Sequence, residues 1–308
     1  MPLIDVLVVG VGRWGFRHLS TLKEMQNLGE IGELRAYDID LSKREIVEQI
    51  GAIWSPQYRH HDSVAIIATS SSSHFDIALE LINEGMHVLI EKPMAQTVED
   101  ARALMAAALS KGVHIETGLL LRHHPAVKQT RRLIAQGEIG DIERIHCIRH
   151  SSRSNIDGES IIDILATHYL DLCCHLLHEA EPTSITSDIL EEGNKVKCSI
   201  SMEFEPGIEA LCDVSWGSEN EIKQVQIFGT TDNISIELDN YEELFQGDQK
   251  ISLKNTISPL KAELQSFIRR IEAGVDISTI PQRPALRSVS WKDMLSFSSS
   301  GVMGLQQH

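Results

Sequence analysis

Hydrophobic residues in the first part of the chain occur in short runs separated by stretches with helical spacing. The runs, each bounded by Gly, Asp or Ser, cover residues 6–9, 34–37, 64–68, 88–90 and 113–115. Between them, residues 75–84 and 98–111 carry apolar side chains three or four positions apart, the spacing of one helix face. Strands that alternate with helices are typical of a parallel sheet covered on both faces. The pattern predicts a doubly wound α/β domain over residues 1–120.

The pattern changes after His124. Helical spacing predicts helices over residues 126–135 and 161–177, with a strand at 142–148 between them. Strand-like runs then follow one another without helices, at residues 184–190, 195–204, 208–216, 222–228 and 233–238. Consecutive strands of this kind pair antiparallel, so residues 121–308 are predicted to form an α+β domain on a mostly antiparallel sheet. Further helices are predicted at 259–273 and 285–299, and we expect these C-terminal helices to pack back on the first domain.

Length and charge narrow the function classes. With 308 residues, the chain has room for about two domains, and 42% hydrophobic and 23% charged residues are ordinary globular values. The 44 acidic and 28 basic side chains give a net charge of −16, which repels phosphate backbones and anionic lipids. We therefore expect no nucleic-acid and no membrane partner. The apolar residues 3–9 are too few for a membrane span and are predicted to form a buried strand, not a signal peptide.

Cysteine and histidine spacing gives no metal motif. The five cysteines are odd in number and include no Cys-x-x-Cys pair: Cys147, Cys173, Cys174, Cys198 and Cys212. This argues against a disulfide framework or a zinc site and favours a reducing cytoplasm. The adjacent His123 and His124 point in different directions, and the nearby carboxylates lack ligand spacing. No metal is predicted.

A glycine-rich string follows the first strand and opens a helix. In Gly10-Val11-Gly12-Arg13-Trp14-Gly15, the first glycine would make the tight turn, the second would admit a pyrophosphate, and the third would allow close helix packing. Alone, such a string can be only a turn. The second strand, however, ends at Asp38, the separation at which a carboxylate meets the adenosine ribose. That carboxylate would repel a 2′-phosphate, so NAD is favoured over NADP; the alternative is that Asp38 caps a helix near Leu41.

Two further polar strings follow predicted strands. Residues 68–74 read Ala-Thr-Ser-Ser-Ser-Ser-His, and residues 91–93 read Glu-Lys-Pro. Because the carboxyl ends of parallel strands line the ligand crevice, both strings are predicted to lie beside the nicotinamide. The cofactor-contacting candidates are Gly10, Gly12, Arg13, Trp14, Gly15, Asp38, Thr69, Ser70, Ser71, His74, Glu91 and Lys92. Lys92 could also donate a hydrogen bond or a proton to substrate, although a lysine after a strand is usually a solvated charge.

These strings resemble the Gfo/Idh/MocA-type oxidoreductases, named for glucose-fructose oxidoreductase and inositol dehydrogenase. The resemblance covers nearly the whole chain and also rests on His18, Arg122, Pro125, residues 137–140 and residues 168–172. Glu-Lys-Pro is its most specific part. It implies a Rossmann domain, a second domain with an open-faced sheet, and hydride transfer between nicotinamide and a sugar or cyclitol carbon. It also implies that Lys92 orients the reacting hydroxyl and that His168 is the proton acceptor or its partner.

Chemistry agrees with these roles, because oxidation of a secondary alcohol needs a hydride acceptor, a base and a cation that stabilises the alkoxide. NAD, His168 and Lys92 would supply them, unless His168 is only a satisfied helix histidine. The family usually carries Asp or Asn four residues before this histidine, where the chain has Ile164, with Asp163 one step further away. One residue turns an α-helix by about 100°, so the pattern leaves the role of Asp163 in catalysis open.

Two other departures concern the nucleotide domain. Ser70 stands where the family's usual Ala-Thr-Pro string has proline. Residues 51–63 are fewer than the family's usual third strand, helix and loop. The edge of this domain is therefore expected to be trimmed.

The substrate is suggested by a short segment. Residues 121–126, Leu-Arg-His-His-Pro-Ala, resemble members that oxidise C3 of UDP-linked N-acetylated sugars. Arg122 is a planar donor suited to phosphate or carboxylate. The substrate-binding candidates are Lys92, Arg122, His124, Arg149, Arg153 and His168, although solvated charge explains Arg149 and Arg153 equally well.

The sequence thus predicts an NAD(P)-dependent sugar or nucleotide-sugar dehydrogenase, with NAD favoured. Two alternatives stay open: a non-catalytic NAD- and sugar-sensing regulator, and a glycosidase-like enzyme that recycles its NAD. An open sheet face also needs a cover, and Val214, Trp216, Val225 and Ile227 could supply a partner surface. A homodimer or homotetramer is expected.

Overall fold

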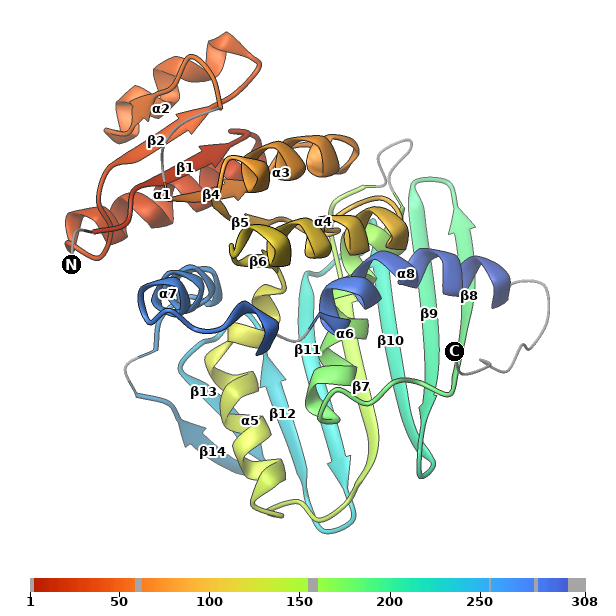
Figure 1. Cartoon of the computed structure of the whole chain (residues 1–308). Helices are drawn as coiled ribbons and strands as arrows, with labels where there is room; N and C mark the ends of the chain where they lie inside the picture. Colours follow the sequence, from red (N-terminus) through yellow and green to blue (C-terminus); the bar gives the residue numbers. More distant parts are fainter. Residues whose placement is uncertain (1–2, 59–62, 155–159, 255, 280–281, 299–308) are drawn as a thin grey trace. The chain divides into compact units, whose positions relative to one another are not determined.

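The computed structural model describes residues 3–58, 63–154, 160–254, 256–279 and 282–298 (Figure 1). The chain divides into two compact units. Unit 1 comprises Met1–Leu119 and Leu260–Val289, and unit 2 comprises Leu120–Pro259 and Ser290–His308. No helix within the described ranges combines the length and apolar character that a membrane crossing requires.

Unit 1 is built on a six-stranded parallel sheet, which confirms the predicted α/β fold. The spatial order is β3-β2-β1-β4-β5-β6. The strands are β1 (Val6–Val9), β2 (Leu34–Tyr37), β3 (Ile53–Trp54), β4 (Val64–Ile67), β5 (His87–Ile90) and β6 (Ile115–Thr117). The central strands β1 and β4 are fully buried, as parallel strands covered on both faces must be. The edge strand β3 has only two residues, so this edge of the sheet is short.

Helices cover both faces of this sheet. They are α1 (Arg13–Asn27), α2 (Arg44–Ile50), α3 (His74–Asn83), α4 (Val98–Lys111) and α7 (Pro259–Glu272). Alternate residues of β1 enter different cores: Val8 packs with Leu22 of α1 and Phe267 of α7, whereas Val9 packs with residues of α3 and α4. A second helix near the C-terminus, α8 (Arg283–Ser298), begins in unit 1 and ends in unit 2.

Unit 2 contains an eight-stranded sheet in the order β14-β13-β12-β11-β7-β10-β9-β8. Its strands are β7 (Ile142–His150), β8 (Ser184–Glu192), β9 (Lys195–Phe204), β10 (Ile208–Trp216), β11 (Ile222–Gly229), β12 (Asn233–Glu237), β13 (Glu243–Gln246) and β14 (Gln249–Ser252). Every neighbouring pair is antiparallel except β7 and β10. The predicted mostly antiparallel α+β architecture is confirmed.

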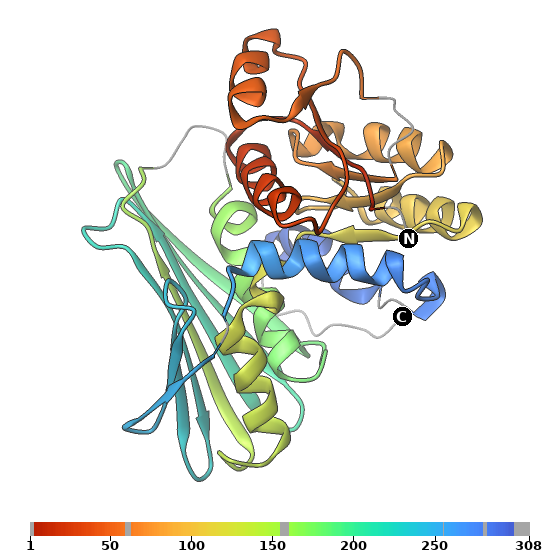
Figure 2. The same ribbon diagram turned by 90° about the vertical axis from the view of Figure 1, so that its left-hand side faces the viewer.

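Two helices pack on one face of this sheet, α5 (Pro125–Ala135) and α6 (Thr167–Leu176), and the views in Figures 1 and 2 show both on the same side. Four side chains expected on the open face instead lie in the core beneath these helices. They are at most 2% exposed: Val214, Trp216, Val225 and Ile227. The expectation is wrong because a two-residue period separates the faces of a strand but does not say which face the helices cover.

Candidate active site

The glycine-rich loop between β1 and α1 leaves space beside its backbone. Gly10 has φ +90°, and a Cβ there would lie 2.8 Å from the carbonyl oxygen of Ala68. A Cβ on Gly15 would lie 1.8 Å from the carbonyl oxygen of Gly10, so only glycine permits this packing of α1. A Cβ on Gly12, by contrast, would have no neighbour within 4 Å among the described residues. Open space at a helix N-terminus fits a pyrophosphate.

Asp38, directly after β2, is tied to this loop. Its Oδ2 accepts a hydrogen bond from the Val11 amide at 2.6 Å, and its Oδ1 accepts one from the Asp40 amide at 2.8 Å. The helix-capping role considered for Asp38 belongs to Asp40, whose Oδ1 accepts a hydrogen bond from the Ser42 amide at 3.0 Å. Asp38 therefore fits the position of the carboxylate that meets the adenosine ribose.

Other cofactor candidates lie on the first turn of α1 and after β4. Arg13 is exposed, and Trp14 is half-buried with the Arg17 guanidinium 4.9 Å from its ring centroid. Ser70 is exposed, whereas Thr69 and Ser71 are half-buried. Because β1, β4 and β5 are neighbours and parallel, the loops that follow them meet at one edge of the sheet.

His74 and Glu91, also predicted to contact the cofactor, are engaged by the protein itself. The His74 ring is 1% exposed, with Nδ1 2.8 Å from the Pro93 carbonyl oxygen and Nε2 3.2 Å from that of Thr69. Glu91 is 7% exposed, and its Oε1 lies 2.7 Å from His18 Nε2. These contacts occupy both ring nitrogens of His74, so they favour a supporting role over a direct contact with NAD.

Lys92 follows β5 and is half-buried. Its backbone amide donates a hydrogen bond to Glu91 Oε2 at 3.3 Å. Lys92 therefore lies at the same edge of the sheet as the glycine-rich loop.

In unit 2, a π-helical turn over Ile162–Ala166 precedes α6, where a single α-helix was predicted. The Thr167 amide donates to the carbonyl oxygen of Ile162, five residues back. Ile164 packs against the apolar core, whereas Asp163 and His168 are half-buried. A π-turn closes its hydrogen bond one residue later than an α-turn, which amounts to inserting one residue into the helix.

Arg122, expected to bind a substrate anion, is held by carboxylates of this chain. It lies in the short helix η3 (Leu120–His123) and donates two hydrogen bonds to Asp171, both at 2.7 Å. Two more go to Glu179, at 2.8 and 3.0 Å. Burial alone would lower the pKa of Arg122, but these two carboxylates raise it above its usual value. Four of its five donors are thus committed to this chain, which favours a structural role for Arg122 over contact with a substrate anion.

The structure also argues against the predicted substrate-binding role of His124. It is fully buried, its Nδ1 accepts the Ala126 amide at 3.2 Å as the cap of α5, and its Nε2 lies 3.2 Å from the Leu238 carbonyl oxygen. Burial lowers the pKa of His124 to about 4, so the ring is neutral. It fixes the start of α5 and is not available to substrate.

The remaining substrate candidates lie at the end of β7 and beyond it. Arg149 donates to Glu221 at 2.8 Å, and Glu221 also accepts the Ser152 amide at 2.6 Å. Burial opposes ionisation of Glu221, yet the hydrogen bonds from Ser152 and Arg149 lower its pKa to about 2. Arg153 is half-buried and precedes residues 155–159, which lie outside the described ranges.

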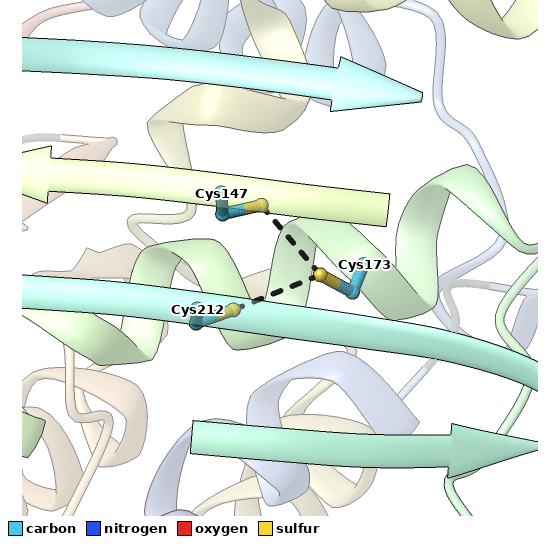
Figure 3. Close-up of side chains that lie close together, drawn as sticks. All are labelled: Cys147, Cys173 and Cys212. Atoms are coloured by element: carbon cyan, nitrogen blue, oxygen red, sulfur yellow. Dashed lines mark hydrogen bonds between the residues drawn. The ribbon is translucent and has the colours of Figure 1, made fainter. Parts of the chain in front are cut away.

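Three cysteines converge in the core of unit 2, although their sequence spacing gave no sign of it. Figure 3 shows Cys173 of α6 between Cys147 of β7 and Cys212 of β10, with Sγ separations of 3.7 and 3.9 Å. The three sulfurs lie within 4.8 Å of one another. Metal binding requires thiolates, but hydrogen bonding to Cys173 and burial raise the pKa of Cys147 well above its usual value. We interpret the group as packed neutral thiols; the alternation of buried positions in β7 and β10 could have indicated it.

Most of each unit matches a protein-family model. Residues 4–119 match a family model described as "Oxidoreductase family, NAD-binding Rossmann fold", and residues 127–235 match "GFO/IDH/MocA C-terminal domain". An inositol 2-dehydrogenase of Salmonella typhimurium is 28% identical over 185 residues, which is 56% of this chain and 54% of that protein. The chain thus spans about half the length of this relative. The rhizopine catabolism protein MocA of Rhizobium meliloti is 28% identical over 73% of this chain and 75% of its own.

Solved structures show the same fold. Levoglucosan dehydrogenase in complex with NADH and L-sorbose has a TM-score of 0.85 at 17% identity and covers 100% of both chains. UDP-N-acetylglucosamine 3-dehydrogenase GnnA from Acidithiobacillus ferrooxidans has a TM-score of 0.81 at 20% identity, over 97% of this chain and 98% of its own. Together with the two family models and the glycine-rich loop, this fold shows that the chain belongs to the GFO/IDH/MocA family of oxidoreductases and carries its NAD-binding Rossmann domain.

Proposed function

We propose that the chain is an NAD-dependent dehydrogenase that oxidises a secondary alcohol of a sugar. The observation that carries this proposal is the position of Lys92 at the sheet edge that also bears the glycine-rich loop and Asp38. Three of the proteins named above are dehydrogenases, of inositol, levoglucosan and UDP-N-acetylglucosamine. These three compounds share ring carbons that bear secondary hydroxyl groups.

Each part of the reaction then has a residue of this chain. NAD, when bound, supplies the hydride acceptor. Lys92 donates a hydrogen bond to the reacting hydroxyl oxygen and stabilises the negative charge that develops there. His168 accepts the hydroxyl proton as the general base.

Asp163 is the proposed partner of His168. The π-turn at Ile162–Ala166 adds one residue between Asp163 and His168, compared with an α-helix in which the carboxylate stands four residues before the histidine. Ile164 packs into the core instead. The extra residue therefore compensates for the shifted sequence spacing.

For the substrate we propose C3 of a UDP-linked N-acetylated hexosamine. Residues 121–126 and the fold match to GnnA support this choice. Within this segment Arg122 and His124 are held by the protein itself, so the segment supports the choice only as a resemblance, and Arg149 and Arg153 are further candidates for substrate contacts. We also infer a cytoplasmic location, because the five cysteines are buried and their number and spacing give no disulfide framework.

A substrate panel tests the proposal. The purified protein is mixed with NAD or NADP and with UDP-N-acetylglucosamine, its uronic acid, levoglucosan, free hexoses or inositols, and NADH absorbance is followed. We expect NADH with NAD and a UDP-sugar. NADH with an inositol or levoglucosan instead would retain the dehydrogenase and reject the nucleotide sugar. NAD binding without NADH from any compound would favour the sensor, or the glycosidase-like enzyme if a glycoside is cleaved.

A further inference from the structure

The backbone around Lys92 is held from one side by a buried histidine of α1. His18 is 0% exposed, and its Nε2 donates to Glu91 Oε1 at 2.7 Å. The other oxygen of Glu91, Oε2, accepts the backbone amide of Lys92 at 3.3 Å. His18 therefore reaches the Lys92 amide through a single carboxylate, and a hydrogen bond to an ionised group is stronger than one between neutral groups.

A second buried histidine, at the start of α3, holds the other side. His74 Nδ1 lies 2.8 Å from the carbonyl oxygen of Pro93, and Nε2 lies 3.2 Å from that of Thr69. Burial lowers the pKa of His74, so the ring is neutral and carries one N–H. The shorter separation favours Nδ1–H donating to Pro93. The residues before and after Lys92 are thus each bonded to a histidine, from two different helices.

A third helix places an acidic side chain near Glu91. Glu263 of α7 is 2% exposed, and the Leu119 backbone and the Arg270 charge favour its ionised form but are outweighed. Burial and then the neighbouring carboxylates of Glu91 and Glu116 raise the pKa of Glu263 well above its usual value. A neutral Glu263 places no second negative charge near the carboxyl group of Glu91, which accepts the Lys92 amide and contacts His18.

We propose that His18 and His74 are positioning residues that fix Lys92 for catalysis, His18 through the Glu91 carboxylate and His74 through the Pro93 carbonyl. The inference rests on the proposed function, because it assigns Lys92 to the reacting hydroxyl. Misplacement of a catalytic group by about 1 Å costs on the order of 10²-fold in rate. Side chains that support such a group therefore act on kcat more than on binding.

Substitutions that keep or remove one donor test each histidine. Asparagine places its amide near the position of histidine Nδ1, and glutamine places its amide near that of Nε2. His74→Leu and His18→Leu are expected to lower kcat by about 10- to 100-fold, with NADH affinity within about threefold of wild type. His74→Asn and His18→Gln should recover most of the loss. His114→Leu, which removes another buried imidazole of unit 1, is the control and should leave kcat unchanged.

The route through Lys92 is tested in a Lys92→Met background. If the histidines act by positioning Lys92, their leucine substitutions should cost less than about threefold there, because the effects of groups that act together are not additive. Equal losses in both backgrounds would overturn the proposal. So would Asn and Gln variants as impaired as the Leu variants.

Hydrogen exchange gives a readout that needs no turnover. In the leucine variants, amide exchange over residues 88–95 should be at least about tenfold faster than in wild type, and the Asn and Gln variants should restore protection. Unchanged exchange over residues 88–95 would contradict the proposal that His18 and His74 fix this segment. If wild type binds NAD but oxidises no substrate, the proposed function fails while exchange still decides whether His18 and His74 hold the segment.

Discussion

At the scale of single residues, Glu263 makes a prediction about stability. Its folded pKa is raised by burial and by Glu91 and Glu116, so ionisation favours the unfolded chain. The resulting loss of stability is absent below the unfolded pKa of about 4.3 and grows as pH rises toward the folded pKa. Glu263→Gln should therefore be more stable than wild type at pH 8, by about 1–3 kcal/mol, but not at pH 4.

Thermal unfolding at the two pH values checks this. Glu272→Gln, an exposed position on the same helix α7, is the matched control and should behave as wild type at both. An equal gain from Glu263→Gln at pH 4 and pH 8 would contradict a neutral, buried acid.

Asp38 makes a prediction about cofactor choice. Its carboxylate is held by the Val11 amide, where it would repel the 2′-phosphate of NADP. Asp38→Ser should reduce the preference for NADH over NADPH by about 10- to 100-fold, since one close charge repulsion costs a few kcal/mol at most. Fluorescence titration of both cofactors measures the ratio. Asp40→Ser, which removes a neighbouring carboxylate but keeps a side chain that can cap the helix, should keep the preference, and a similar change in both variants would reject the assignment.

Candidate residues for cofactor binding and catalysis are easier to predict from the sequence than the residues with which each side chain forms hydrogen bonds. The glycine string, Asp38 and Lys92 could be predicted because turn geometry and strand ends require particular residue types. Arg122 was assigned to a substrate anion because its partners Asp171 and Glu179 lie 49 and 57 residues away. Such pairing depends on tertiary packing and leaves no local pattern.

At the scale of elements, the π-turn before α6 predicts how Asp163 acts. Asp163→Leu should lower kcat by about 10²-fold or more and alter the acidic limb of the pH profile, because it removes the polar side chain that assists the general base. Deleting Ile164 should convert the π-turn to an α-turn and set the carboxylate four residues before His168. This deletion variant should keep kcat within about tenfold of wild type.

Circular dichroism of the same samples establishes that each variant is folded. A folded deletion variant as inactive as Asp163→Leu would show that the π-turn does not serve this spacing.

The positions of long helices and strands follow from the periodicity of apolar residues, whereas short strands and local irregularities in a helix do not. Long runs such as β9, with its strict alternation of buried and exposed residues, were predicted at the residues where they occur. The pattern does not predict the strands β13 and β14, since each is only four residues long and contains at most two apolar residues. The sequence pattern does not predict the π-turn, because one inserted residue changes the spacing of apolar positions too little to distinguish it from an ordinary α-helix.

At the scale of the whole molecule, the eight-stranded sheet of unit 2 makes a prediction about assembly. The face opposite α5 and α6 carries apolar and aromatic side chains, including the half-buried Leu211 and Phe228 and the exposed Phe245. We expect a homodimer or homotetramer through this face, because such a surface is stabilised by burial. Static light scattering should give a multiple of 34.4 kDa, and Leu211→Glu should lower it. A mass of one chain would contradict this.

The fold type of each unit follows from the sequence pattern. The face of the second sheet that the helices cover does not. Alternating strands and helices predict a parallel sheet, and consecutive strands predict an antiparallel one. The parallel pairing of β7 with β10 brings together segments more than fifty residues apart, and no local signal encodes it. The same uncertainty about non-local packing led to the wrong face being assigned to Trp216.

Lys92 is proposed to act on the reacting hydroxyl, and NADH formation by Lys92→Met tests this role. At saturating NAD and substrate, its rate should fall by about 10²- to 10³-fold, the cost of removing one donor to a developing oxyanion, while NADH binding stays within about threefold. Lys111→Met, at the exposed end of α4, is the control and should match wild type. A folded Lys92→Met variant that retains the wild-type rate would show that Lys92 does not act on the reacting hydroxyl.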